Sequence, residues 1–589
     1  MKTLRCAMLL LVFAAGAGAA DRGLAPLPFD HILTSDELTR LLREWQTSRP
    51  DLMDLESIGT TPGKRPIWFV TITNRNSGPA ESKPALLVDG NMHATEWAGG
   101  VAALHFIAKL LREYGTDERV TRLLNTRTVY VLPRMTPDGV DATLAQGRFI
   151  RSVDRPYPGD RPERGIHAQD VDGDGRTLFM RLRDPNGPWK EYPGDRRLLV
   201  PREPDEAGGE AWRVLPEGIV EGYDGATIAD APAREPIDLG ANFPGDRGSA
   251  PPSPAAGPYP ASEPEVAAYV AAIARRPNIV AHVTCHTFGG LILTPPVNLA
   301  ERLPAADRSV YETLAAKGAA LTGYRAMSYL DLRAQDRETY IPSAFGWLYD
   351  RRGIYSFITE LWNPLEAAGI SLEGTTVSAW LWGHHPIEDE IKLLRFSDAE
   401  LGGEGFVRWR PFHHPQLGEV QIGGFDLIRY WYNVPFKRLE KEVAPHSDWL
   451  VYLGLATPRI AVREFSAEPA AGNVHRLRLV VENRGWLPTN GSQQAVDQNA
   501  VGGVAAELML PPGARLVQGE KRTVLGQLQG RTAQRSTATW WSYAPGTPDR
   551  ALAEWIVAAP AGTKIAVHVT HERAGIADAE VVLGKGERR

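Results

Sequence analysis

A chain of 589 residues is longer than one hydrophobic core usually serves, so we expect two or more domains. The net charge of -6 argues against a general affinity for nucleic acid. Of the two cysteines only Cys285 lies beyond the N-terminal segment, so we expect no internal disulfide and a fold held by its apolar core.

Residues 1–20 have the pattern of a secretory signal peptide. The start is basic, with Lys2 and Arg5, residues 7–15 are apolar but too few to span a bilayer, and small residues lead to a cleavage site near Ala20. No later stretch has the length and apolar character of a transmembrane helix. We therefore expect an exported protein, periplasmic or secreted, without membrane insertion.

Residues 28–455 alternate segments of strand pattern and helix pattern. Strands are expected at residues 67–73, 85–89, 128–132, 279–285 and 353–359. Helices are expected at residues 35–46, 97–112, 305–322 and 375–394, and a capping box at Ser262-Glu263-Pro264-Glu265 starts another that ends near Arg275. This alternation indicates an α/β domain with a mixed, mostly parallel twisted sheet and helices on both faces.

Other stretches depart from this alternation. Residues 152–260 are crowded with Pro, Gly, Asp and Arg, which predicts a loop-rich insertion over the edge of the sheet. Residues 397–455 are aromatic-rich and irregular, which predicts an extension packed on the sheet domain. Residues 456–589 alternate apolar and polar side chains with a period of two, which predicts a separate, smaller all-β sandwich.

Within the insertion, residues 170–175 resemble a calcium-binding loop. Asp170, Asp172 and Asp174 alternate with other residues, and a glycine stands sixth, as in such loops. Position twelve is Arg181, where a calcium-binding loop has Glu. One interpretation is a bound calcium ion. The other is a turn in which the carboxylates pair with nearby arginines, Arg176, Arg181 or Arg183.

His93 and Glu96 lie where the strand at residues 85–89 gives way to a turn. An imidazole and a carboxylate at this spacing can bind one zinc ion together, if at least one further ligand comes from elsewhere. Because ligands bind beyond the carboxyl ends of strands in such sheets, we expect that ligand to be His286, at the end of the strand at residues 279–285.

Two neighbours of His286 are weaker candidates. His282 lies four strand residues away, roughly 13 Å, so only one of these histidines can reach the metal. Cys285 is turned to the opposite face by the alternation of the strand, and we expect it to be a core thiol. Glu360 ends the apolar strand at residues 353–359, and it is the candidate general base for a metal-activated water. A salt-bridged residue at the end of a strand is the alternative interpretation of Glu360.

A series of motifs between residues 29 and 394 closely resembles, in order and spacing, the zinc carboxypeptidases of the carboxypeptidase A type. The motifs are His93-x-x-Glu96-Trp97, Thr136-Pro137-Asp138-Gly139, Arg148-x-x-Arg151, Asp238-Leu239-x-x-Asn242-Phe243, Ser262-Glu263-Pro264-Glu265, His286-Thr287-Phe288 and Phe357-x-x-Glu360-Leu361. Each motif alone is weak, but the ordered set is specific.

The resemblance implies a zinc metallopeptidase that hydrolyses peptide bonds. It implies that one zinc ion is bound by three side chains, His93, Glu96 and His286. It implies that Glu360 takes a proton from the attacking water and passes it to the leaving amine. Arg151 matches the arginine that polarises the scissile carbonyl, and Asp238 matches the acid that holds a ligand imidazole in one tautomer.

Some positions depart from the family pattern. Gly240 and Ala241 stand where the family usually has an Asn-Arg pair that grips the terminal carboxylate of the substrate, and Thr95 often corresponds to an arginine. Neither Gly nor Ala can replace a bidentate guanidinium. Tyr340 is a candidate for the mobile tyrosine of the family, with structural packing as the alternative.

Three functions stay open on this basis. The leading one is a metallocarboxypeptidase-type peptidase. The second is an amidase or endopeptidase that acts on substrates without a free C-terminal carboxylate, such as cell-wall peptides. The third is an inactive binding protein with a relic site. A peptide substrate is the expected partner, and the sequence specifies no oligomeric state.

Overall fold

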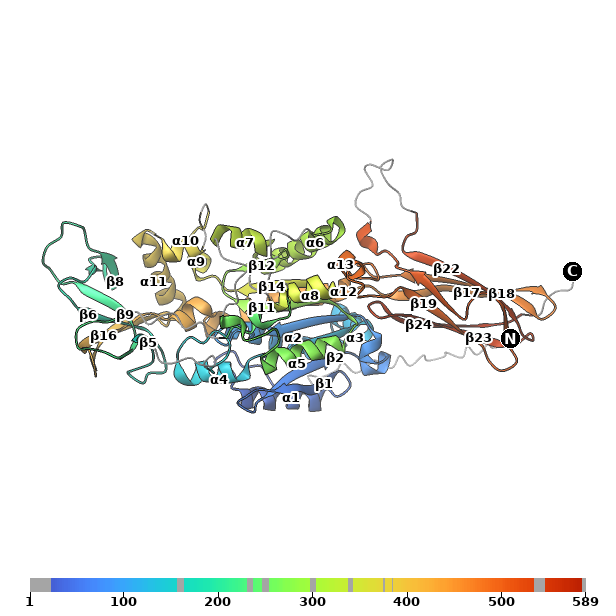
Figure 1. Ribbon diagram of the computed structural model, residues 1–589, viewed down its shortest axis with the longest axis horizontal. Coiled ribbons are helices and arrows are strands. Elements are labelled where there is room, and N and C mark those ends of the chain that lie inside the picture. The colour runs from blue at the N-terminus through green and yellow to red at the C-terminus, as the bar shows by residue number, and fades with distance from the viewer. Residues whose placement is uncertain are drawn as a thin grey trace, which may run out of the picture.

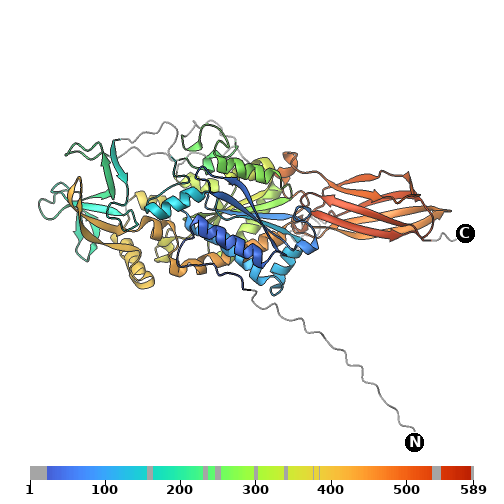
Figure 2. The same cartoon turned by 90° about the horizontal axis from the view of Figure 1, so that it is seen from below.

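The computed structural model describes residues 23–155, 164–229, 237–245, 254–296, 303–336, 343–373, 375, 377–383, 385–533 and 546–584. The predicted signal peptide and Tyr340 lie outside these ranges. The molecule is elongated, with an α/β domain in the middle, a small sheet at one end and a two-sheet domain at the other (Figures 1 and 2). Among the described residues, no helix combines the length and apolar character needed to cross a membrane.

The central sheet has eight strands in the order β1-β2-β4-β3-β11-β14-β12-β13. They are β1 (Met53–Thr60), β2 (Pro66–Ile72), β3 (Ala85–Gly90), β4 (Thr128–Leu132), β11 (Ile279–Thr287), β12 (Leu291–Thr294), β13 (Arg325–Ser328) and β14 (Tyr355–Leu361). The pairs β3/β4, β3/β11, β11/β14 and β12/β13 are parallel, whereas β1/β2, β2/β4 and β12/β14 are antiparallel. The predicted mixed, mostly parallel sheet is therefore confirmed.

Successive side chains of the central strands enter two different cores, one on each face of the sheet. In β3, Leu86 and Val88 belong to one core and Ala85 and Leu87 to the other. The first core is covered by α1 (Ser35–Ser48), α2 (Trp97–Glu113), α3 (Glu118–Thr126), α6 (Ala305–Thr322) and α12 (Phe436–Ala456). The second is covered by α5 (Pro264–Ala274) and α8 (Ala344–Arg352). Helices on both faces are thus confirmed.

Two glycines let the first turn of α2 lie directly against the ends of β3 and β11. A Cβ at Gly99 would come within 2.2 Å of the Cys285 carbonyl oxygen, and a Cβ at Gly100 within 2.0 Å of Asn91 Oδ1. Any larger residue would push the helix away. The close approach places Glu96, which immediately precedes α2, beside the end of β11.

Residues 152–260, expected to be a loop-rich insertion, contain six short strands between their described loops. This stretch forms β5 (Gly165–Ala168), β6 (Phe179–Arg183), β7 (Trp189–Tyr192), β8 (Asp195–Pro201), β9 (Trp212–Pro216) and β10 (Gly218–Glu221). Four of these strands join β15 (Phe406–His414) and β16 (Gly418–Phe425) in a six-stranded sheet of order β15-β16-β6-β9-β7-β8, while β5 pairs with β10. The strands are short and their partners are distant, as when Met180 pairs with Ile422, so local periodicity is weak.

Two helix predictions also need correction. The helix expected at residues 375–394 is divided into α10 (Val377–Trp382) and α11 (Ile387–Leu401), because Pro386 between them cannot continue a helix. The capping box is absent, since α5 begins at Pro264 without a side-chain cap.

Residues 397–455, predicted to be irregular, form strands β15 and β16 and the helix α12. The remaining helices are α4 (Pro137–Gln146), α7 (Tyr329–Asp336), α9 (Pro364–Ala367) and α13 (Gln493–Asp497).

The C-terminal region has the predicted all-β arrangement. One sheet has the order β17-β18-β22-β20 and the other β21-β19-β23-β24. The strands are β17 (Ile460–Ala471), β18 (Val474–Asn483), β19 (Val504–Met509), β20 (Arg515–Gln518), β21 (Arg522–Gly526), β22 (Arg550–Ala558), β23 (Lys564–His571) and β24 (Gly575–Val582). Leu477, Leu479, Ile565 and Val567 face one another in a common core, as their period of two predicts.

Candidate metal centre

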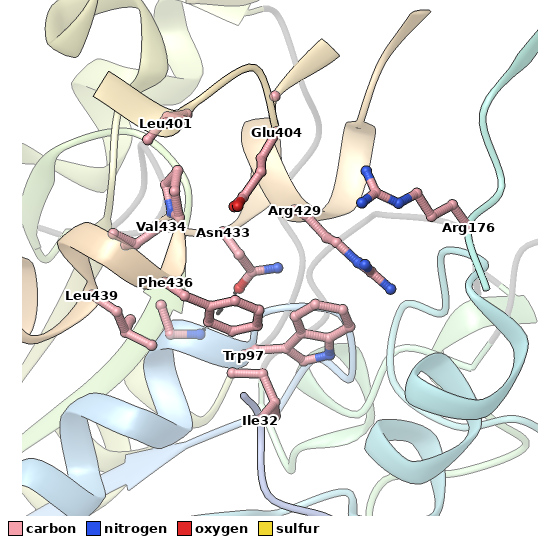
Figure 3. A pocket seen from close by; sticks show the side chains of 13 residues that line it. Ile32, Trp97, Arg176, Leu401, Glu404, Arg429, Asn433, Val434, Phe436 and Leu439 are labelled. Carbon is pink, nitrogen blue, oxygen red and sulfur yellow. Dashed lines mark hydrogen bonds between the residues drawn. The ribbon is translucent and has the colours of Figure 1, made fainter. Parts of the chain in front are cut away.

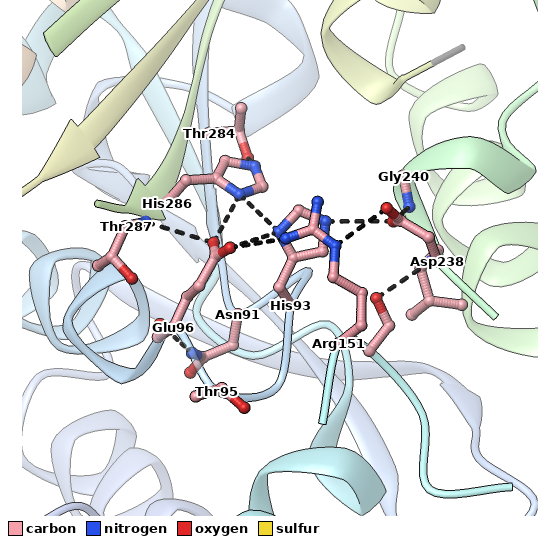
Figure 4. Close-up of polar contacts among 12 residues, drawn as sticks. Asn91, His93, Thr95, Glu96, Arg151, Asp238, Gly240, Thr284, His286 and Thr287 are labelled. Atoms are coloured by element: carbon pink, nitrogen blue, oxygen red, sulfur yellow. Dashed lines mark hydrogen bonds and ion pairs between the residues drawn. The ribbon is translucent and has the colours of Figure 1, made fainter. Parts of the chain in front are cut away.

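His93, Glu96 and His286 meet where β3 and β11 end (Figure 4). Nδ1 of His93 lies 2.8 Å from Glu96 Oε1, and Nδ1 of His286 lies 2.8 Å from Glu96 Oε2. The two Nδ1 atoms are 3.0 Å apart. The turn that carries the first pair is held by Asn91, whose Nδ2 donates to the Glu96 carbonyl oxygen at 2.6 Å.

This donor set fits a zinc ion. One donor atom from each of His93, Glu96 and His286 lies within 4.8 Å of the others, and the side chains are buried. Two imidazole nitrogens cannot face each other at contact distance unless a proton or a cation lies between them. Two neutral nitrogens and one carboxylate oxygen match a catalytic zinc site, which keeps a fourth position for water or substrate.

The charge of Glu96 is set by its neighbours. Burial alone would raise the pKa of the Glu96 carboxyl, but His93 and His286 outweigh this effect and hold its pKa well below the usual range. Glu96 is therefore a carboxylate, and it adds a backbone contact when Thr287 N donates to its Oε2 at 3.3 Å. An anion so deeply buried is stable only beside positive charge.

Each ligand histidine has a second partner that orients its ring. Asp238 Oδ1 lies 3.2 Å from Nε2 of His93, and Thr284 Oγ1 lies 3.0 Å from Nε2 of His286. A proton on Nε2 of His93 is donated to Asp238, which leaves the lone pair of Nδ1 facing the metal position. The structure thus places Asp238 where the resemblance implied.

We expect Asp238→Asn to weaken zinc binding by about 10–100-fold, the range typical for loss of a partner of a metal-ligating histidine. The amide keeps the shape of the side chain but loses the charge that attracts the Nε2 proton of His93. The measurement is zinc affinity by competition with a chromophoric chelator. Asp224→Asn is the control, because Asp224 accepts from the backbone of its own turn. Equal zinc affinity in both variants would contradict the assigned role of Asp238.

Glu360 lies in β14, where it is the register partner of His286 in the adjacent strand β11. No described residue forms an ion pair or a side-chain hydrogen bond with its carboxylate, so the salt-bridge interpretation gains no support. Burial raises the pKa of Glu360 to about 7; the charge of Glu96 acts in the same direction, while His286 opposes it. A carboxylate with a pKa near neutrality is well suited to accept and return a proton.

Arg151 reaches the centre from the loop after α4. Its Nε donates to Asp238 Oδ2 at 3.0 Å and its Nη1 to Glu96 Oε1 at 3.1 Å. Among the described residues, Nη2 has no partner and is free to meet a substrate. The loop is aligned by Thr95, whose Oγ1 donates to the Ile150 carbonyl oxygen at 2.8 Å and accepts from Ile150 N at 2.9 Å.

The positions of the missing carboxylate clamp are buried. A Cβ at Gly240 would lie 3.0 Å from Asp238 Oδ1, and Ala241 is only 3% exposed. Thr95 is occupied by its two bonds to Ile150. The described residues at these three positions therefore provide no cation for a terminal carboxylate.

The acidic loop at residues 170–175 is a turn stabilised by an arginine, but not one of the predicted arginines. Asp172 and Asp174 both pair with Arg410 of β15, while Asp170 accepts from Gly173 N at 2.7 Å and Gly175 N at 2.8 Å. The three arginines considered from the sequence pair elsewhere, Arg176 with Asp426, Arg181 with Glu191 and Arg183 with Glu210. The calcium interpretation gains no support from this arrangement.

The neighbours of His286 behave as expected. His282 is turned away from the metal position, because its Nε2 lies 2.7 Å from Asp89 Oδ2 in the buried interior. Cys285 is a free, buried thiol, and burial raises its pKa. The core role predicted for Cys285 is confirmed.

Asn433 is a contributor that the sequence did not suggest. Its Nδ2 donates to the Thr95 carbonyl oxygen at 2.7 Å, and its Oδ1 accepts from Ala98 N at 3.1 Å. It also lines a cavity of about 60 Å³ at the start of α2, together with Trp97 and Arg429 (Figure 3). None of the predicted metal ligands borders this cavity, so it is distinct from the metal centre.

Comparisons with known proteins agree with this geometry. Residues 38–177 and 227–373 match a family model described as zinc carboxypeptidase, and residues 459–582 match a domain of unknown function (DUF8731). Carboxypeptidase A4 of Mus musculus is 30% identical over 115 residues, which are 20% of this chain and 27% of that protein. Carboxypeptidase B of Homo sapiens is 32% identical over 113 residues, which are 19% of this chain and 26% of that protein. This chain therefore aligns with about a quarter of the length of these relatives.

Among solved structures, carboxypeptidase A from Helicoverpa armigera shares 18% identity, with a TM-score of 0.39 over 59% of this chain and 68% of that chain. The two segments of this chain that match the family model contain the three predicted metal ligands, His93, Glu96 and His286, together with Arg151, Asp238 and Glu360. The part of the chain that carries the metal centre therefore belongs to the zinc carboxypeptidase family.

Proposed function

We propose that this protein is an exported peptidase that hydrolyses peptide bonds with the help of one zinc ion held by His93, Glu96 and His286. The observation that carries this proposal is the meeting of the three ligands with Glu360 at the carboxyl ends of three adjacent strands, β3, β11 and β14. The signal-peptide pattern of residues 1–20 supports the export.

The roles of the protein groups follow from their positions. Zinc, when bound, supplies Lewis acidity to the attacking water and to the scissile carbonyl. Glu360 accepts a proton from that water and delivers it to the leaving amine. Arg151 donates from Nη2 to the carbonyl oxygen as negative charge develops there. Asp238 holds both His93 and Arg151 in place through its two oxygens.

A second candidate concerns the substrate. Gly240, Ala241 and Thr95 provide no clamp for the C-terminal carboxylate of a substrate. We therefore propose that the favoured substrates have no free C-terminal carboxylate next to the cleaved bond. Internal bonds, amidated ends and cell-wall peptides belong to this class. An inactive binding protein is the least favoured alternative, since a relic site has no reason to keep a base and an arginine aligned with the ligands.

A pair of peptides tests both statements. We expect a peptide with a free C-terminus and its C-terminally amidated form to be cleaved with kcat/KM values within about 10-fold of each other, and a chelator to stop both reactions. The charged clamp of a strict carboxypeptidase contributes about 1.5–3 kcal/mol per hydrogen bond, or more than 10-fold in kcat/KM. A kcat/KM for the amidated peptide that is more than 100-fold below that for the free peptide would favour a strict carboxypeptidase instead.

A further inference from the structure

Tyr432 packs on Phe149 and Phe288, which lie two residues from Arg151 and His286, although it belongs to a segment outside the two parts of this chain that match the zinc carboxypeptidase model. It ends the π-helical turn at Leu427–Tyr432, which follows β16. Turns of this type are rare and occur frequently at functional sites. The segment is therefore a feature of this chain whose contribution to the site needs its own explanation.

The turn is fastened at both ends. At its start, Asp426 Oδ1 accepts from Ile428 N at 3.0 Å and from Arg429 N at 2.7 Å. At its end, Asn433 bonds to the Thr95 carbonyl oxygen and to the amide of Ala98, on either side of Glu96. Tyr432 is consequently held at a fixed position relative to a predicted metal ligand.

The ring of Tyr432 packs on two aromatic residues that flank the site. Its centroid is 5.0 Å from that of Phe149, two residues before Arg151, and 5.1 Å from that of Phe288, two residues after His286. These contacts orient the ring. Phe149 lies on the loop that carries Arg151, and Phe288 directly follows β11, the strand that carries His286.

The hydroxyl of Tyr432 remains available. It forms no hydrogen bond with any described residue, and the side chain is half-buried. Burial raises the pKa of Tyr432, the charges of Glu96 and Glu360 raise it further, and Arg151 acts in the opposite direction. The group is thus a neutral phenol, and it can donate one hydrogen bond to an occupant of the site.

We propose that the Tyr432 hydroxyl donates a hydrogen bond to a main-chain carbonyl of the peptide substrate next to the scissile amide, and so aligns the peptide between Glu360 and Arg151. This inference rests on the proposed peptidase function. A neutral donor suits an amide carbonyl, and the site offers no guanidinium at the clamp positions. Tyr432 then supplies, from outside the matched family segments, part of the substrate grip that Gly240 and Ala241 do not.

Tyr432→Phe tests the proposal, because it removes the hydroxyl and keeps the ring between Phe149 and Phe288. We expect kcat/KM for a cleaved peptide to fall about 10-fold, with zinc content unchanged. A substrate in which the flanking amide is replaced by an alkene isostere should lose a similar factor with the wild-type enzyme. With Tyr432→Phe that substrate should lose nothing further, since the two changes remove the same bond.

Tyr430→Phe is the matched control. Tyr430 lies on the same turn, but its hydroxyl donates to the Leu393 carbonyl oxygen at 3.0 Å in the core. This variant should keep kcat/KM within twofold of the wild-type value.

Binding gives a readout that needs no turnover. The peptide should bind about 10-fold more weakly to the zinc-loaded double variant Glu360→Gln, Tyr432→Phe than to Glu360→Gln alone. Equal kcat/KM and equal binding with and without the hydroxyl would overturn the role of Tyr432 while leaving the peptidase proposal intact. Failure of the wild-type protein to cleave any peptide would overturn the peptidase proposal itself.

Discussion

Glu360→Gln is expected to lower kcat by about 10²–10⁴-fold while the zinc content stays at one ion per chain. Glutamine matches the shape of the side chain but cannot accept a proton from the attacking water. Because the Glu360 side chain forms no hydrogen bond or ion pair with a described residue, its neutral replacement removes a half-buried carboxylate without breaking such a bond. Steady-state assays on a cleaved peptide measure kcat, and metal analysis of the same sample measures the zinc content.

Glu366→Gln is the matched control for this experiment. Glu366 lies on α9, six residues beyond Glu360, and pairs with Arg325 at 3.5 Å near the surface. We expect this variant to retain most of the activity. A Glu360→Gln protein that keeps more than a tenth of the wild-type kcat would show that another group accepts the proton.

His286→Ala is expected to abolish stoichiometric zinc binding and, with it, activity. The loss of affinity should exceed the roughly 10–100-fold expected when a partner such as Asp238 is changed, because a donor atom itself is removed. Wild-type protein should gain about 2.7 kcal/mol of unfolding free energy at a free zinc concentration 100 times its Kd. The variant should show no such zinc-dependent rise in Tm.

His413→Ala controls for the loss of a histidine. His413 is exposed on β15 and pairs with Glu419 across the strand pair. Its replacement should leave the zinc content and the zinc-dependent rise in Tm unchanged. Full zinc occupancy in His286→Ala would contradict the assignment of the third ligand.

The strands that carry the site could be predicted because their signals are local. The apolar segments at residues 85–89 and 279–285 reappear as β3 and β11, and parallel pairing brings their carboxyl ends together. Strand alternation also separated Cys285 from His286 correctly. The ordered motifs then added Arg151 and Asp238, which no local pattern would have assigned to the same site.

Other features depend on contacts between distant segments and had no local signal. The sheet that joins β6 to β16 pairs strands that lie far apart in the chain, and each strand alone is too short to show a clear period. The approach of Tyr432 to the site depends on the bond from Asn433 to Thr95, which are 338 residues apart. Arg410, the partner of Asp172, was hidden for the same reason. The break at Pro386, in contrast, could have been predicted from the proline itself.

We propose that this chain cleaves peptide bonds and needs zinc to do so. The most direct measurement is the digestion of a peptide library by the purified protein, read by mass spectrometry, with a chelator and after zinc is restored. We predict cleavage that stops with the chelator, returns with zinc and is strongly reduced in Glu360→Gln. Absence of cleavage by the zinc-loaded protein, or cleavage that persists in the chelator, would contradict the claim.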